Sequence, residues 1–150
     1  MLGVLRSQLG LLREVKALVP PERESFAYAP GKWTVRELAG HLGDGERVFG
    51  FRAFSFGRAD ATPLPGFDEN EYVARASFRT TPLADLVDEL LLQREANLLL
   101  FRNLAADRWS AAGSANGHRV TVRALAFIMA GHVRHHLGTL RERYGVPVGP

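Results

Sequence analysis

Three of the five histidines fall close together near the C-terminal end of the chain. His132 and His136 are four residues apart, so they lie one above the other on the same face of a helix. Two imidazoles in this arrangement can bind one divalent cation at about 2.0–2.1 Å from each nitrogen. His135, three residues after His132, is near this face and is a competing ligand. The spacing predicts part of a metal site.

A catalytic metal commonly has three protein ligands and one open position. The candidate third ligand is His41, which lies on the apolar side of a second helical segment, whereas His118 lies in a polar stretch and is a weaker candidate. A single core histidine is usually structural. Three core-facing histidines on two helices, in a chain without thiols, favour metal binding.

The chain contains no cysteine. This excludes disulfides, thiolate metal sites, iron–sulfur clusters and cysteine nucleophiles. No small-residue cleavage site follows the apolar N-terminal segment, which charged residues interrupt. Together these features indicate a cytoplasmic protein, and any thiol used in its chemistry must come from another molecule.

Two acidic residues and one arginine accompany His41 along its segment. Asp44 lies about one turn after His41, where it is either a partner that orients the imidazole or a surface carboxylate. Glu46 lies further around the helix and either serves the site or forms a salt bridge with an arginine of a neighbouring helix. Arg52 shares the face of His41 and either binds an anionic group of a substrate or extends to solvent, which is the favoured interpretation.

Apolar residues recur at helical steps of three and four in four segments of the chain. Thr34 and Glu37 match a capping box at the start of the second segment, and Gly145 and Pro147 supply a stop after the fourth. The predicted helices run from about Leu2 to Val19, from Thr34 to about Phe56, from Thr81 to about Leu104, and from about Thr121 to Tyr144.

Two long connections separate the last three helices, at 57–80 and 105–120. Neither contains a convincing alternating run of the kind that predicts a strand. Four helices with two long crossovers predict an all-α four-helix bundle, in which some sequence neighbours run parallel, as a single domain over residues 1–150. Four glycines within the second helix, which cost about 1 kcal/mol each relative to alanine, predict close packing or a nearby ligand. They are Gly40, Gly43, Gly45 and Gly50.

The 150 residues carry a formal net charge of +3, with a calculated pI of 9.8. The basic residues are scattered singly among acidic ones and form no basic stripe, so we expect no nucleic-acid partner. No segment has the roughly 20 apolar residues that span a bilayer, so we expect no membrane partner either.

Four phenylalanines wrap more than one face of the second helix, which predicts a homodimer. They are Phe49, Phe51, Phe54 and Phe56.

Three sequence motifs together resemble those of the DinB/YfiT-like superfamily, and in particular its DinB-like branch. They are Gly31-Lys32-Trp33-Thr34-Val35-Arg36-Glu37-Leu38 with Gly40-His41-Leu42, then Pro63-Leu64-Pro65-Gly66-Phe67-Asp68-Glu69-Asn70, and finally Gly131-His132 with His135-His136 and Leu140-Arg141-Glu142-Arg143-Tyr144. The resemblance implies an up-down-down-up bundle. It also implies a divalent metal, zinc or nickel, held by His41, His132 and His136.

Relatives in the wider superfamily include thiol S-transferases that use bacillithiol or mycothiol, and a mycothiol-dependent maleylpyruvate isomerase. The resemblance therefore implies a metal-dependent enzyme that activates a low-molecular-weight thiol for transfer to a small-molecule substrate. The alternatives are a non-catalytic metal-binding or ligand-binding stress-response protein and a metal-dependent hydrolase.

Overall fold

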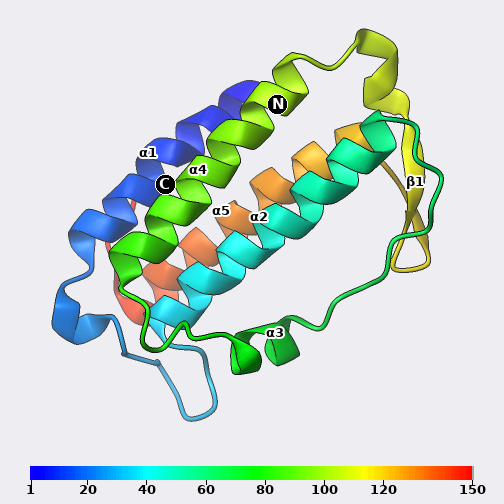
Figure 1. The fold of residues 1–150 in the computed structure, drawn as a ribbon. Coiled ribbons are helices and arrows are strands. Elements are labelled where there is room, and N and C mark those ends of the chain that lie inside the picture. Colours follow the sequence, from blue (N-terminus) through cyan, green and yellow to red (C-terminus); the bar gives the residue numbers. More distant parts are fainter. Residues whose placement is uncertain (150) are drawn as a thin grey trace.

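A computed structural model describes residues 1–149 of the chain. Its four long helices lie side by side, with α1 and α5 running in one direction and α2 and α4 in the other (Figure 1). Their bounds are α1 (Leu2–Leu18), α2 (Val35–Gly57), α4 (Leu83–Arg102) and α5 (Val122–Tyr144). The predicted all-α bundle with up-down-down-up topology is confirmed, because the crossover from α2 to α4 lets these two helices run parallel.

Side-chain caps fix where the two helices that carry the histidines begin. The Thr34 hydroxyl accepts a hydrogen bond from the Glu37 amide, and the Glu37 carboxylate accepts one from the Thr34 amide at 2.8 Å. This is the predicted capping box. The Thr121 hydroxyl accepts from the Ala124 amide at the start of α5, which ends at Gly145 in the left-handed conformation with φ of 68°.

The first long crossover contains a short helix that was not predicted. Helix α3 (Glu69–Arg75) begins after Asp68, whose carboxylate accepts hydrogen bonds from the amides of Asn70 and Glu71. Two 3₁₀ turns, η1 (Pro21–Arg23) and η2 (Ala106–Ser110), complete the connections.

The second long crossover contains a small antiparallel hairpin, so the expectation that it lacks strands was wrong. Strands β1 (Ala112–Ala115) and β2 (His118–Thr121) pair across a two-residue turn. Asn116 and Gly117 form this turn with positive φ of 52° and 75°, and Asn-Gly favours such a turn. The strands are short and rich in small residues, so they lack the alternation from which a strand is predicted.

Aliphatic side chains from the four long helices fill the interior. Two of the α2 glycines face bulky neighbours that a β-carbon would overlap: Gly40 lies against Phe78, and Gly50 lies against Asn97. The close packing predicted from these glycines is therefore confirmed at both positions. Within residues 1–149, no helix is both long and apolar enough to cross a membrane.

Candidate metal centre

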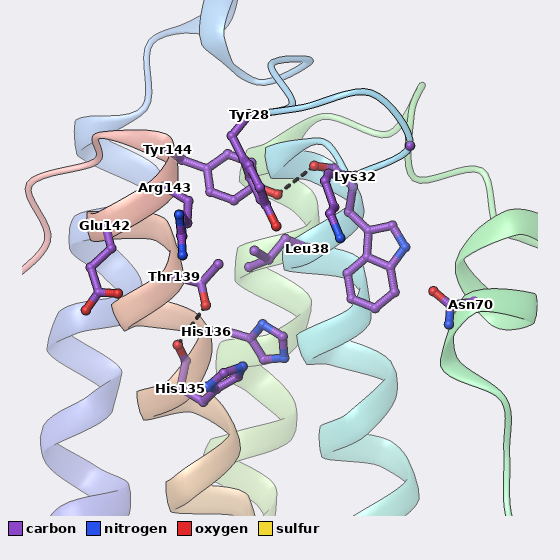
Figure 2. Close-up of a pocket in the computed structure, with 12 residues that line it drawn as sticks. Tyr28, Lys32, Leu38, Asn70, His135, His136, Thr139, Glu142, Arg143 and Tyr144 are labelled. Carbon is purple, nitrogen blue, oxygen red and sulfur yellow. Dashed lines mark hydrogen bonds between the residues drawn. The ribbon is translucent and has the colours of Figure 1, made fainter.

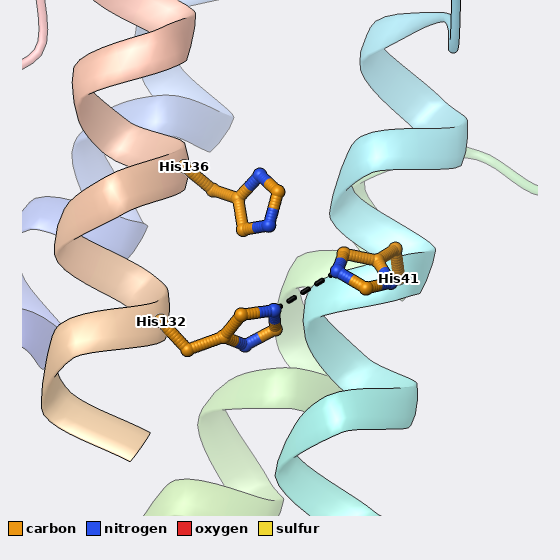
Figure 3. A group of neighbouring side chains, drawn as sticks. All are labelled: His41, His132 and His136. Atoms are coloured by element: carbon orange, nitrogen blue, oxygen red, sulfur yellow. Dashed lines mark hydrogen bonds between the residues drawn. The ribbon is translucent and has the colours of Figure 1, made fainter. Parts of the chain in front are cut away.

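The side chains of His41 on α2 and of His132 and His136 on α5 converge between the two helices (Figure 3). One ring nitrogen of each lies within 4.8 Å of the others. The Nε2 atoms of His41 and His132 are 2.9 Å apart, and each pair of ring centroids is separated by 4.8 Å. The structure thus brings together the three residues that the motifs single out.

Helix geometry and one small residue, Gly45, determine where these rings lie. His132 and His136 are one turn apart on α5, which lies antiparallel to α2 (Figure 1). Gly45 lies one turn after His41, and a β-carbon there would be 2.6 Å from Cε1 of His132. The absence of a side chain at position 45 therefore makes room for the His132 ring.

Burial keeps the three imidazoles in the form that binds metal. It lowers the pKa of His41, and together with the neighbouring imidazoles it lowers the pKa of His132 to about 4 and that of His136 to about 3. All three rings are neutral at pH 7 and offer a nitrogen lone pair. A metal ligand needs this lone pair, because protons and cations compete for it.

The chemistry of this cluster fits a divalent cation. Two nitrogens on one tetrahedral zinc ion, each about 2.0–2.1 Å away, are about 3.3 Å apart, close to the 2.9 Å between His41 and His132. Within residues 1–149, the buried Nδ1 atoms of His41 and His136 have no hydrogen-bond partner. Three neutral imidazoles, two of them with an unsatisfied nitrogen, therefore suggest a divalent metal.

Aromatic rings wall the cluster on two sides. The ring centroids of Trp33 and His41 are 4.7 Å apart. Phe49 meets His132 edge-on, with the two ring centroids 5.6 Å apart. The two tryptophans lie in different surroundings. Trp109 stacks on Phe101 at 5.5 Å, whereas Trp33 lies directly beside the histidines.

A cavity of about 490 Å³ opens beside His136 (Figure 2). The Tyr144 hydroxyl donates a hydrogen bond of 2.6 Å to the carbonyl of Trp33, which ties the loop before α2 to the end of α5. Burial raises the pKa of Tyr144 to about 12, so it stays protonated as this donor. The cavity is lined by Tyr28, Gly31, Lys32, Trp33, Leu38, Asn70, His135, His136, Thr139, Glu142, Arg143 and Tyr144.

The other two histidines lie outside the three-membered cluster. His135 is exposed and lines the cavity, with its ring 4.9 Å from that of His136. His118 is exposed on β2. The geometry therefore groups His136, rather than His135, with His41 and His132.

Asp44 is half-buried and, within residues 1–149, makes no hydrogen bond to the unsatisfied Nδ1 of His41. Burial and nearby Glu89 raise the pKa of this carboxyl, and Arg47 opposes the rise. The role of Asp44 at the site stays a prediction.

Arg52 does not extend to solvent, since it is buried and donates a 2.8 Å hydrogen bond to the carbonyl of Pro65.

Of the two roles left open for Glu46, the structure shows the salt bridge with an arginine of a neighbouring helix. Arg94 on α4 meets Glu46 through two hydrogen bonds of 2.8 Å, and both side chains are almost completely inaccessible to solvent. Arg94 also donates to Gln8 on α1 at 2.7 Å, and Gln8 donates to the carbonyl of Ala130 on α5. Arg94 and Gln8 do not stand out in the sequence, because both lie in segments with the pattern of ordinary amphipathic helices.

The fold and the histidine cluster define a helical-bundle protein with a candidate metal centre. The family model of the DinB superfamily matches residues 5–140, and the chain belongs to this superfamily. The resemblance found in the motifs is thereby confirmed over nearly the whole bundle.

Two solved structures share this fold. YfiT from Bacillus subtilis, described as a probable metal-dependent hydrolase with an unusual four-helix bundle topology, superposes with a TM-score of 0.85 at 18% identity, over 96% of this chain and 85% of YfiT. A mycothiol-dependent maleylpyruvate isomerase superposes with a TM-score of 0.73 at 20% identity, over 91% of this chain. This chain spans 57% of that isomerase. Comparison with curated protein sequences gives no match.

Proposed function

We propose that this protein is a metal-dependent enzyme that acts on a small molecule, with His41, His132 and His136 as the metal ligands. The observation that carries this proposal is the convergence of three neutral imidazoles from two helices beside an open cavity. A divalent cation held there, zinc or nickel, supplies Lewis acidity that lowers the pKa of a bound thiol or water.

The surrounding residues would hold and shield the reacting groups. Trp33 and Phe49 pack against the ligand rings, so they restrict both the motion of the rings and the access of water. His136 lies at the boundary between the cluster and the cavity, so a substrate in the cavity reaches the cluster from this side. Asp44 is the candidate for moving a proton or orienting His41, with a carboxyl pKa already raised by burial.

Thiol transfer is the leading reaction. The chain has no cysteine, so the sulfur nucleophile arrives on a low-molecular-weight thiol. The thiol loses its proton, a sulfur–carbon bond forms to the electrophilic substrate, and the leaving group departs with the electron pair of the broken bond. The mycothiol dependence stated for the structurally similar isomerase supports this choice.

Metal-dependent hydrolysis is the second candidate, with water as the nucleophile in place of the thiol. The description of YfiT as a probable metal-dependent hydrolase favours it. The two reactions use the same ligands and the same cavity. They differ in whether turnover requires an added thiol.

The first test is metal analysis of protein purified without a histidine tag. We expect about one zinc or nickel ion per chain, and we expect His132→Ala to lose most of it. His118→Ala is the matched control, because this exposed histidine lies on the hairpin and should leave the metal content unchanged. Absence of stoichiometric metal, with no difference between the two variants, would contradict the metal site.

The second test separates catalysis from binding. The metal-loaded protein is assayed with a panel of low-molecular-weight thiols and electrophilic acceptors, and with ester, amide and phosphoester substrates. Turnover that needs both metal and thiol supports transfer, and turnover without thiol supports hydrolysis. No metal-dependent turnover in either panel would favour the non-catalytic metal-binding protein.

We also propose a homodimer, on the basis of two apolar rings that α2 leaves in solvent. Phe51 and Phe54 are 57% and 47% exposed, whereas Phe56 is fully buried and Phe49 contacts His132. Sedimentation of the protein and of a Phe51→Ser variant tests this. A protein that sediments as a monomer would contradict the proposal.

A further inference from the structure

We propose that the cavity beside His136 binds a small organic anion, with Lys32 and Arg143 as the residues that select its charge. One part of this proposal rests on the proposed function, namely that the other end of the ligand faces the histidine cluster. It assigns the substrate class of the site as an apolar molecule that carries a carboxylate or similar group.

The first observation is that two cationic side chains of the cavity lack partners. Lys32 comes from the loop before α2, and Arg143 comes from the last turn of α5. Within residues 1–149, neither side chain forms a hydrogen bond or a salt bridge, although many other arginines pair with acids, such as Arg36 with Glu24. In Figure 2 the ammonium group of Lys32 and the guanidinium group of Arg143 both point along the bundle, in the direction in which His136 lies.

The second observation concerns the one acidic residue of the cavity. Glu142 lies at its edge, and its carboxylate points away from Lys32 (Figure 2). Glu142 also lines a separate hollow along α5, which Lys32 and Arg143 do not line. The cavity therefore carries two exposed cations without partners and one acid that is turned away from Lys32, so its field favours an anion.

The third observation is the aromatic and aliphatic lining of the same cavity. Tyr28 and Tyr144 meet edge-on at 5.1 Å, and Trp33 and Leu38 continue this lining toward the cluster. A ligand that fits this arrangement has a flat or aliphatic body and an anionic end. With the anion near Lys32 and Arg143, the body of the ligand extends toward His136.

Fluorescence of Trp33 offers a direct test with phenylacetate as the probe and neutral phenylacetamide as its isosteric comparison. A Trp109→Phe background leaves Trp33 as the only tryptophan, since the chain has two. We expect phenylacetate to bind more tightly than phenylacetamide. We expect Lys32→Gln and Arg143→Gln each to weaken the binding of phenylacetate by up to about fivefold, which is the effect of one exposed charge contact. The affinity for phenylacetamide should stay unchanged.

The matched control is Arg102→Gln, because Arg102 is also an exposed arginine in the last turn of a long helix but does not line the cavity. It should leave both affinities unchanged, and Lys32→Arg should retain the preference for the acid. All titrations are repeated on protein stripped of metal with a chelator. The preference for phenylacetate should persist there, so the result does not depend on whether the metal site exists.

Three outcomes would overturn the proposal. The first is equal affinity for the acid and the amide. The second is a loss of phenylacetate binding that is as large in Arg102→Gln as in the cavity variants. The third is a preference for the acid that vanishes on metal removal and is unaffected by Lys32→Gln, which would assign the anion to the metal alone.

Discussion

At the scale of single residues, Gly45 is the position where the backbone of α2 makes room for a metal ligand. In Gly45→Ala the new β-carbon would lie 2.6 Å from Cε1 of His132, so the imidazole must move. Because Phe49 and His41 also touch this ring, we expect it to leave its position toward the other ligands. Metal affinity should fall about tenfold or more, as when a ligand loses its orientation. Competition with a metal indicator measures this.

Gly43 on the same helix provides the control for this substitution. The nearest atom to a β-carbon at position 43 is 3.9 Å away, an ordinary contact. Gly43→Ala should stabilise the helix by up to about 1 kcal/mol and leave metal affinity unchanged. Equal metal affinity in the two variants would contradict the role assigned to Gly45.

The sequence predicted the histidines of the cluster better than the residues around them. The spacing of His132 and His136 follows directly from helix geometry, and the α2 motif identified His41. The position of Trp33 beside the histidines could not be predicted, because a sequence does not show how the loop before a helix folds back. This loop carries the Trp33 ring against His41, and a hydrogen bond from Tyr144, distant in sequence, joins the Trp33 carbonyl to α5.

At the scale of elements, the start of α2 depends on an ionised carboxylate. Burial alone would raise the pKa of Glu37, but hydrogen bonds from the Thr34 amide and hydroxyl and from Arg79 lower it below its ordinary 4.5. A lowered pKa in the folded state stabilises the fold above the ordinary pKa. This stabilisation is lost as the pH falls through the folded-state value.

Glu37→Gln should therefore destabilise the protein by about 1 kcal/mol at pH 7, a typical value for a lost cap. The difference from the parent should begin to shrink below pH 4.5, where Glu37 of the unfolded chain becomes protonated, and should continue to shrink as the pH falls through the lower pKa of the folded state. Urea unfolding at pH 7 and at pH 3.5, followed by circular dichroism, measures both. Glu22→Gln, at an exposed glutamate that forms no salt bridge within residues 1–149, should change neither value. A pH-independent difference for Glu37→Gln would contradict this account.

The long helices were predictable because each one carries its own periodicity and end signals. The boundaries of α1 and α4 differ from the prediction by only one or two residues. Helix α3 and the hairpin were not predicted, because neither has enough residues to establish a period. The hairpin is held partly by a contact distant in sequence, since the amide of Leu64 donates to the carbonyl of Ser114 at 2.9 Å. The Asn116-Gly117 pair was the available signal.

At the scale of the whole molecule, one buried polar network joins all four long helices. Arg94 reaches Glu46 on α2 and Gln8 on α1, and Gln8 continues to the backbone of α5. Asn97 adds a 3.0 Å hydrogen bond to Glu46. Pairing with an arginine of a neighbouring helix was one of the two roles that the sequence left open for Glu46. The sequence did not identify the arginine, because that choice depends on how the helices are ordered around the bundle.

Arg94→Met should destabilise the protein strongly, because it leaves the Glu46 carboxylate buried without its cation. Removing one member of a buried pair costs about 3–5 kcal/mol, and Glu46→Leu should cost a similar amount. In the double variant Arg94→Met/Glu46→Leu both charges are gone, so most of the lost free energy of unfolding should be recovered. Recovery should be incomplete, since Gln8 and Asn97 also lose hydrogen bonds. Urea unfolding of the four proteins gives the coupling free energy.

The surface pair Arg13 and Glu95 is the control for this cycle, because it also joins α1 to α4, at 3.1 Å, with both side chains about half exposed. Arg13→Met should cost less than about 1 kcal/mol, since water and salt screen an exposed pair. If the Arg94 and Glu46 variants cost no more than this, or if their effects simply add, the network does not join the bundle energetically. A large, non-additive cost would show that the buried pair joins α2 to α4 energetically, in contrast to the exposed pair between α1 and α4.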